Sequence, residues 1–125
     1  MIDNRPVYLN LLKITLPLTG IISFAHRISG FLLFLSMPFA VYLLELSLES
    51  RLSFSRVQYI LSQPLMIAVQ ILLLWSMAHH FFAGLRFLLI DAEIGVDKAW
   101  SRVGAWLVIL AEAVTVFVVI AMVML

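Results

Sequence analysis

The sequence contains no cysteine and little charge, and each shortage excludes a class of function. Without cysteine, the 125-residue chain forms no disulfide and has neither a thiolate metal ligand nor a thiol nucleophile. Only 12% of its residues are charged, and the net charge of +1 gives no reason to expect nucleic acid as a partner. No glycine-rich dinucleotide-binding pattern is present, so we expect no flavin site in this chain. The sequence is instead 64% hydrophobic, above the roughly 45–50% of a soluble domain.

Three charge-poor runs predict transmembrane helices: residues 28–44, 57–85 and 103–125. About 20 apolar residues at 1.5 Å each cross a bilayer core, so each run is long enough, the first with its flanks. We therefore predict an all-α membrane protein, a single membrane-anchor domain over residues 1–125. Its three helices are expected at roughly 23–46, 63–90 and 102–125.

The segments between these helices are more polar or contain proline. Met1–Gly20 is too short to span and too apolar for a free tail, so we expect it to lie along the membrane interface. No signal-peptide cleavage pattern precedes the first span, which we expect to be retained. Pro38 is expected to kink the first helix. Glu45–Ser62 is expected to be a short wet connection, and Asp91–Arg102 the turn at the opposite side.

Lysine and arginine are unevenly shared between the two sides of the predicted topology. Six of them fall on the N-terminal side and two on the other. The six are Arg5, Lys13, Arg27, Arg86, Lys98 and Arg102, and the two are Arg51 and Arg56. Because cytoplasmic loops carry the excess of positive charge, the N-terminus is predicted to be cytoplasmic.

A polar stripe lies at the start of the first predicted helix. At helical spacing Ser23, His26, Arg27 and Gly30 share one face, which combines a hydroxyl, an imidazole and a guanidinium with a gap. Ionisable groups at membrane depth usually face a bundle interior and bind something, so we predict a binding site here. Two simpler interpretations stay open: close helix packing at the small residues, and an arginine that reaches the lipid headgroups.

A second cluster, His80, Gly84 and Arg86, lies near the cytoplasmic end of the second predicted helix. An imidazole nitrogen for iron, a gap at Gly84 for the macrocycle and a cation at the rim for the propionates suit a haem. The neighbouring His79 points about 100° away and is not expected to be the second axial ligand. Alternatively, His80 hydrogen-bonds between helices and Gly84 allows close packing.

Together these motifs resemble the cytochrome b556 membrane-anchor subunit of succinate dehydrogenase, respiratory complex II. The resemblance covers the whole chain and rests on Arg5-Pro6, Ser23-x-x-His26-Arg27-x-Ser29-Gly30, His80-x-x-x-Gly84-Leu85-Arg86 and Asp91. It implies a bacterial inner-membrane protein, within a heteromeric helix bundle formed with a second membrane anchor beneath the flavoprotein and iron–sulfur subunits. The chain itself would not oxidise succinate, since that chemistry needs a flavin.

The resemblance also implies roles for individual residues. His80 would be an axial ligand of haem b, the second ligand coming from the partner anchor, with Gly30 and Gly84 packed at the haem. His26 and Arg27 would lie near the haem propionates, and Ser23 and Arg27 would border the ubiquinone site. Some members carry a histidine where this chain has Phe87, so a propionate contact there is lost.

Glu112 departs from the pattern of the family that the chain resembles, because it places a carboxylate near the middle of the third apolar run. An ionised group there costs about 2.5 kcal/mol or more on insertion scales. It is interpreted first as a protonated or hydrogen-bonded packing residue, and alternatively as a proton relay or partner contact. It also supports a rival function, a small transporter or channel subunit that uses Glu112 as its intramembrane carboxylate. A cofactor-free assembly anchor is a third possibility.

Overall fold

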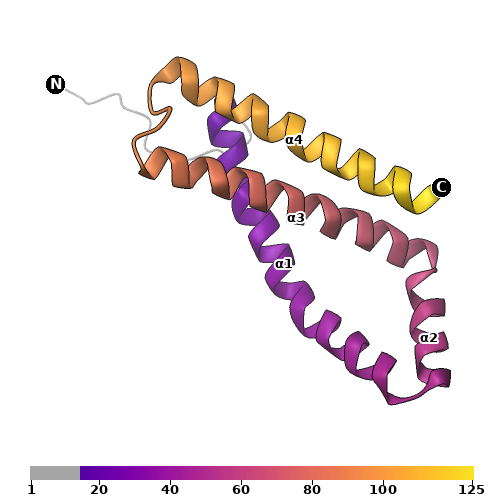
Figure 1. Cartoon of the computed structure of the whole chain (residues 1–125). Coiled ribbons are helices and arrows are strands. Elements are labelled where there is room, and N and C mark those ends of the chain that lie inside the picture. The colour runs from indigo at the N-terminus through magenta and orange to yellow at the C-terminus, as the bar shows by residue number, and fades with distance from the viewer. Residues whose placement is uncertain (1–14) are drawn as a thin grey trace, which may run out of the picture.

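The computed structural model describes residues 15–125, and the described part contains helices and turns but no strand. The helices are α1 (Leu18–Glu49), α2 (Arg51–Leu61), α3 (Pro64–Asp91) and α4 (Lys98–Met124) (Figure 1). All but α2 are long and apolar enough to cross a membrane. The prediction of an all-α protein with three spans is therefore confirmed. The predicted interfacial segment falls mainly on residues 1–14, outside the described residues, and residues 18–20 belong to α1.

α1 is longer than predicted at both ends. It begins at Leu18 rather than at residue 23 and ends at Glu49 rather than at 46. Pro17 precedes it, and the Pro17 carbonyl accepts from the N–H of Gly20 at 2.8 Å and of Ile21 at 3.1 Å, which closes the first turn. α1 continues through Pro38 without a break, since one proline removes one backbone hydrogen bond and leaves the rest of the ladder in place.

The predicted wet connection over Glu45–Ser62 is wrong, because most of it is helical. Residues 45–49 complete α1, and Arg51–Leu61 form the separate helix α2. Ser50 is extended between the two helices, and its Oγ accepts from the N–H of Ser53 at 3.1 Å. This is an N-cap, and no proline or glycine follows before residue 62 to interrupt the helix.

α3 lies within one residue of its predicted bounds, whereas α4 begins four residues before the predicted residue 102. The earlier start follows from Asp97, whose Oδ1 accepts from the N–H of Ala99 at 3.1 Å and of Trp100 at 3.2 Å. The turn is therefore limited to residues 92–97. Glu93 and Gly95 both adopt positive φ in it, 62° and 73°, which reverses the chain tightly.

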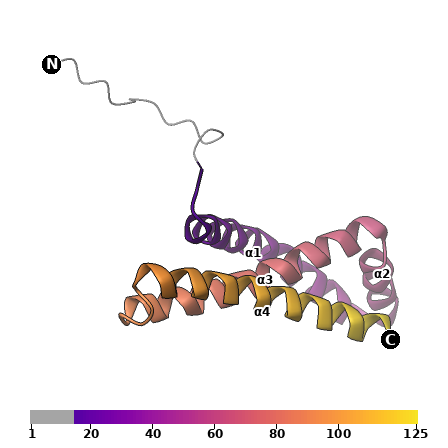
Figure 2. The same ribbon diagram turned by 90° about the horizontal axis from the view of Figure 1, so that it is seen from above.

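α3 and α4 lie side by side and antiparallel, and α1 crosses them (Figures 1 and 2). The start of α1, the end of α3 and the start of α4 meet at one end, whereas α1 and α3 diverge towards α2 (Figure 1). A small core forms where the three spans meet, from Ile22 of α1, Ala83 of α3, and Ala105 and Val108 of α4. Small residues in this core let the helices approach closely.

Candidate functional site

His26 of α1 and His80 of α3 stack directly on one another. Their ring centroids are 4.1 Å apart and their planes differ by 6°. The structure thus brings together the two clusters that the sequence placed in separate helices.

Each of these histidines lies over a glycine of the opposite helix. A Cβ added to Gly30 would lie 2.8 Å from His80 Cε1, and one added to Gly84 would lie 3.4 Å from His26 Nε2. The gap at Gly84, expected for a macrocycle, therefore receives the His26 ring, and the His80 ring lies against Gly30. Because α1 and α3 run antiparallel, the two His-x-x-x-Gly motifs form one reciprocal contact.

The Nδ1 atom of His80 is held by α1. It lies 3.2 Å from the His26 carbonyl and 3.3 Å from Ser29 Oγ, and that hydroxyl itself donates to the His26 carbonyl at 2.9 Å. Since a carbonyl only accepts, this arrangement favours the hydrogen on Nδ1 and leaves the Nε2 lone pair free. Within residues 15–125, Nε2 of His80 has no hydrogen-bond partner.

His79 has the opposite environment, because both of its nitrogens are engaged. Nδ1 pairs with Glu112 Oε2 of α4, and Nε2 lies 3.4 Å from the Ile22 carbonyl of α1. The ring is 2% exposed, and Trp75 stacks on it with centroids 5.3 Å apart. Glu112 is thus a hydrogen-bonded residue between helices, and its side chain is 13% exposed.

The polar stripe of α1 divides between two environments. Ser23, His26 and Gly30 are half-buried and Arg27 is exposed, whereas Ser29, next to the stripe, is buried. The cation therefore lies at the surface of this chain while the neighbouring imidazole packs inward. Asp91, the last residue of α3, is exposed.

Arg86 does not reach an exposed rim as the sequence predicted. It is 7% exposed and turns to α4, where a terminal nitrogen donates to the Ser101 hydroxyl at 2.9 Å and to its carbonyl at 3.2 Å. The side chain packs over Gly104, where an added Cβ would lie 3.4 Å from Arg86 Nε. It ties the end of α3 to the start of α4, a contact that sequence reasoning missed. Gly104 was the available signal, since a glycine inside a span often marks a close approach.

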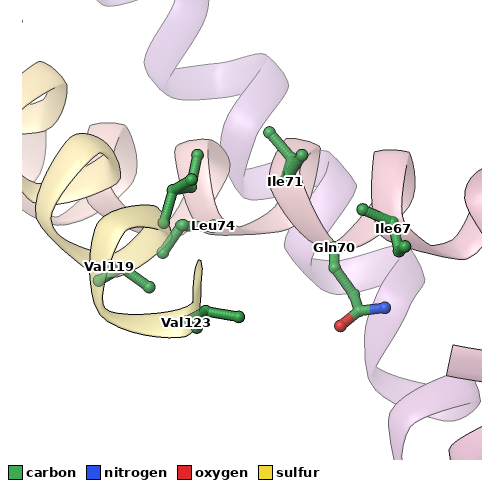
Figure 3. A pocket seen from close by; sticks show the side chains of 7 residues that line it. Ile67, Gln70, Ile71, Leu74, Val119 and Val123 are labelled. Atoms are coloured by element: carbon green, nitrogen blue, oxygen red, sulfur yellow. The ribbon is translucent and has the colours of Figure 1, made fainter. Parts of the chain in front are cut away.

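A cavity of about 410 Å³ lies between α3 and α4, near the start of α3 and the end of α4 (Figure 3). Its lining includes Ile67, Gln70, Ile71, Leu74, Val119 and Val123. The Gln70 amide nitrogen donates to the Leu61 carbonyl at 2.8 Å. This lining contains no charged group or imidazole, so the candidate site is the histidine cluster.

Comparisons with known proteins show the family of the chain. Residues 1–121 match the family described as the succinate dehydrogenase/fumarate reductase transmembrane subunit. The chain is similar to the succinate dehydrogenase cytochrome b556 subunit of Coxiella burnetii, with 34% identity over 90% of this chain and 91% of the relative. It is also similar to the succinate dehydrogenase cytochrome b560 subunit of Reclinomonas americana, with 38% identity over 75% of this chain and 69% of the relative.

Proposed function

The chain belongs to the succinate dehydrogenase/fumarate reductase transmembrane subunit family, and we propose that it is the cytochrome b anchor of a succinate:quinone oxidoreductase. It holds one haem b through His80 and contributes Ser23 and Arg27 to a ubiquinone site. Both curated relatives are named as cytochrome b subunits of succinate dehydrogenase, which supports the haem.

The contrast between the two adjacent histidines carries this proposal. A metal-binding imidazole commonly donates its other N–H to a carbonyl, which fixes the tautomer and orients the ring. His80 has this arrangement, with Nδ1 at the His26 carbonyl and Nε2 free within the described part of the chain. His79 has neither nitrogen free. Of these two neighbours, only His80 therefore fits haem ligation.

The second axial ligand is proposed to come from a partner anchor subunit. His26 is stacked face to face on the His80 ring, so it would not present a nitrogen opposite His80 Nε2 and would not serve as the second ligand. His79 is hydrogen-bonded to Glu112 through Nδ1. When bound, the haem supplies a one-electron carrier. The exposed Arg27 is a cation that would be available to the haem carboxylates, and His26 stacks on the face of the His80 ring.

The quinone site is proposed at the start of α1. Ser23 and Arg27 lie one turn apart on the same helix, and Arg27 is exposed towards whatever covers this chain. Reduction places negative charge on the quinone oxygens, so a hydroxyl donor and a fixed cation stabilise the reduced head group more than the neutral one. Electrons would arrive from the iron–sulfur subunit, which receives them from the flavoprotein.

The orientation proposed for the complex is an N-terminus in the cytoplasm of a bacterial inner membrane. By the helix bounds, Arg27 lies in the first third of α1, Arg86 near the end of α3, and Lys98 and Arg102 at the start of α4. These parts of the helices lie away from α2, which carries the other cations (Figure 1). This is the asymmetry that the excess of positive charge on cytoplasmic loops predicts. The transporter alternative needs a carboxylate open to a water path, whereas Glu112 is bonded to His79 and almost buried.

The absorption and EPR spectra of the purified complex test the haem assignment. His80→Ala should abolish the low-spin b-type signal, because it removes the proposed ligand, whose Nε2 has no hydrogen-bond partner within residues 15–125. His79→Ala is the matched neighbour and should still show a b-type band. A full signal in His80→Ala would refute ligation by His80, and a haem-free wild-type complex would refute the cytochrome role.

Two activity assays test the quinone assignment. Arg27→Leu and Ser23→Ala should lower kcat for succinate-to-quinone electron transfer more than they raise KM, because the interaction strengthens as the quinone is reduced. Succinate oxidation with an artificial acceptor that draws electrons from the soluble subunits should be unchanged. Equal losses in both assays would assign these residues to assembly, and no loss in either would place the quinone elsewhere.

A further inference from the structure

The pair formed by His79 and Glu112 joins all three spans at one imidazole. His79 belongs to α3, its Nδ1 partner Glu112 belongs to α4, and its Nε2 partner is the Ile22 carbonyl of α1. Since that carbonyl only accepts, Nε2 carries a hydrogen, and one further proton lies between Nδ1 and the carboxylate. Whichever atom holds that proton, the pair as a whole is neutral.

Electrical neutrality alone does not explain why a polar pair, rather than an apolar one, occupies this buried position. Two apolar side chains of similar volume would fill the same space, and replacing a buried polar pair in this way is often neutral or stabilising. A carboxylate in a membrane span is costly until it is paired. A polar pair differs from an apolar one because its hydrogen bonds are directional. Each bond therefore fixes the orientation of one helix relative to another.

The neighbouring His80 depends on that orientation. Its ring has little room against Gly30, where an added Cβ would lie 2.8 Å from Cε1. Its Nδ1 reaches α1 at 3.2 Å and 3.3 Å, near the long end of hydrogen-bond distances. A small rotation or slide of α3 against α1 therefore breaks the contacts that orient His80. One residue away, the His79 ring is packed between the three spans at 2% exposure, with Nε2 3.4 Å from the Ile22 carbonyl of α1. That packed ring restrains the motion, and Glu112 fixes its orientation.

We propose that Glu112 is a positioning residue for the haem ligand: through His79 it fixes the rotation of α3 against α1 and thereby the plane of the His80 ring. The inference rests on the proposed function, since it concerns how His80 presents Nε2. It gives the intramembrane carboxylate a role that requires no proton transfer.

The test compares Glu112→Leu and Glu112→Gln in the assembled complex, with Thr115→Ala as the control on the same helix. Thr115 hydrogen-bonds only to the Ala111 carbonyl of its own helix, at 2.8 Å, within the described part of the chain. Two readouts report on the ligand: the EPR g-values of the low-spin haem, which depend on the plane of the axial imidazole, and the rate of haem transfer to an apo-globin acceptor.

Glu112→Leu should shift or broaden the g-values and speed haem loss about tenfold, the lower end of the effect of removing a group that supports a metal ligand. Glu112→Gln offers an amide N–H that can donate to Nδ1 of His79 while Nε2 keeps its hydrogen, and it should stay near wild type, as should Thr115→Ala. Unchanged g-values and haem loss in Glu112→Leu would overturn the proposal. So would equal changes in Glu112→Leu and Thr115→Ala.

If Glu112→Leu fails to assemble, the double variant His79→Leu/Glu112→Leu removes both buried polar groups and leaves neither unpaired. The same two readouts apply to it, and a wild-type EPR signature in the double variant would overturn the proposal. His80→Ala in the same preparation separates the two hypotheses. Retention of haem in that variant refutes ligation by His80, whereas loss of haem there with no effect at Glu112 refutes only the positioning role.

Discussion

The two glycines of the reciprocal contact predict a sharp difference between two identical substitutions. A methyl group added at Gly30 would lie 2.8 Å from His80 Cε1, so the ring must retreat by about 0.6 Å to reach an ordinary contact of 3.4 Å. That movement is away from α1, where the hydrogen-bond partners of Nδ1 already lie at 3.2 Å and 3.3 Å. Gly30→Ala should therefore break both contacts. Gly84→Ala places its methyl group 3.4 Å from His26 Nε2 and needs little adjustment.

The magnitudes follow from opposing effects. Overpacking of this kind costs about 1–3 kcal/mol, and a lost hydrogen bond about 1 kcal/mol more. Alanine in place of glycine in a helix returns about 1 kcal/mol. Gly30→Ala should thus destabilise the subunit by about 1–3 kcal/mol, while Gly84→Ala should be neutral or slightly stabilising.

Thermal denaturation of the purified complex, followed by the haem absorption band, measures both effects. Gly30→Ala should lower the Tm and alter the band, and Gly84→Ala should leave both near wild type. If the two variants behave alike, or if Gly84→Ala has the larger effect, the reciprocal packing is wrong.

Two further predictions concern topology and helix packing. A reporter fused after Ser62 should be active as a periplasmic fusion and one fused after Gly95 as a cytoplasmic fusion; the reverse pattern would place the candidate site at the wrong side of the membrane. Ser101→Ala removes the 2.9 Å acceptor of the buried Arg86 and should lower stability by about 1.5 kcal/mol without changing the haem spectrum. An unchanged Tm would show that Arg86 finds another acceptor.

The transmembrane spans were predictable because a long apolar run is sufficient to identify one. Helix α2 was not predicted because its sequence is polar. Its segment contains Arg51, Arg56 and two serines, which suit a loop as well as a surface helix. The signal available was Ser50, a serine N-cap before eleven residues without proline or glycine. The start of α4 had a similar signal in Asp97, at the head of its apolar run.

The structure brings His26, Gly30, His80 and Gly84 together, but the way in which they contact one another was not predictable from the sequence. His80 and Gly84 lie one turn apart, which suggested a ligand and a gap for the macrocycle on one helix. Side chains on a helix lean towards its N-terminus, so His80 leans away from Gly84, and a ring from an antiparallel neighbour takes that place. Which neighbour it is depends on how α1 and α3 slide against each other, and a single helical pattern does not contain that information. The partner of Glu112 was hidden for the same reason.

Helix α2 also determines how this subunit tolerates insertions and deletions. A flexible connection absorbs an added residue by bulging, whereas a helix lengthens by 1.5 Å and turns by about 100° for each one. α2 joins the divergent ends of α1 and α3 (Figure 1), so one extra residue inside it would swing the start of α3 around its axis. Changes of chain length over evolution should therefore accumulate in the turn at residues 92–97, and α2 should keep its eleven residues.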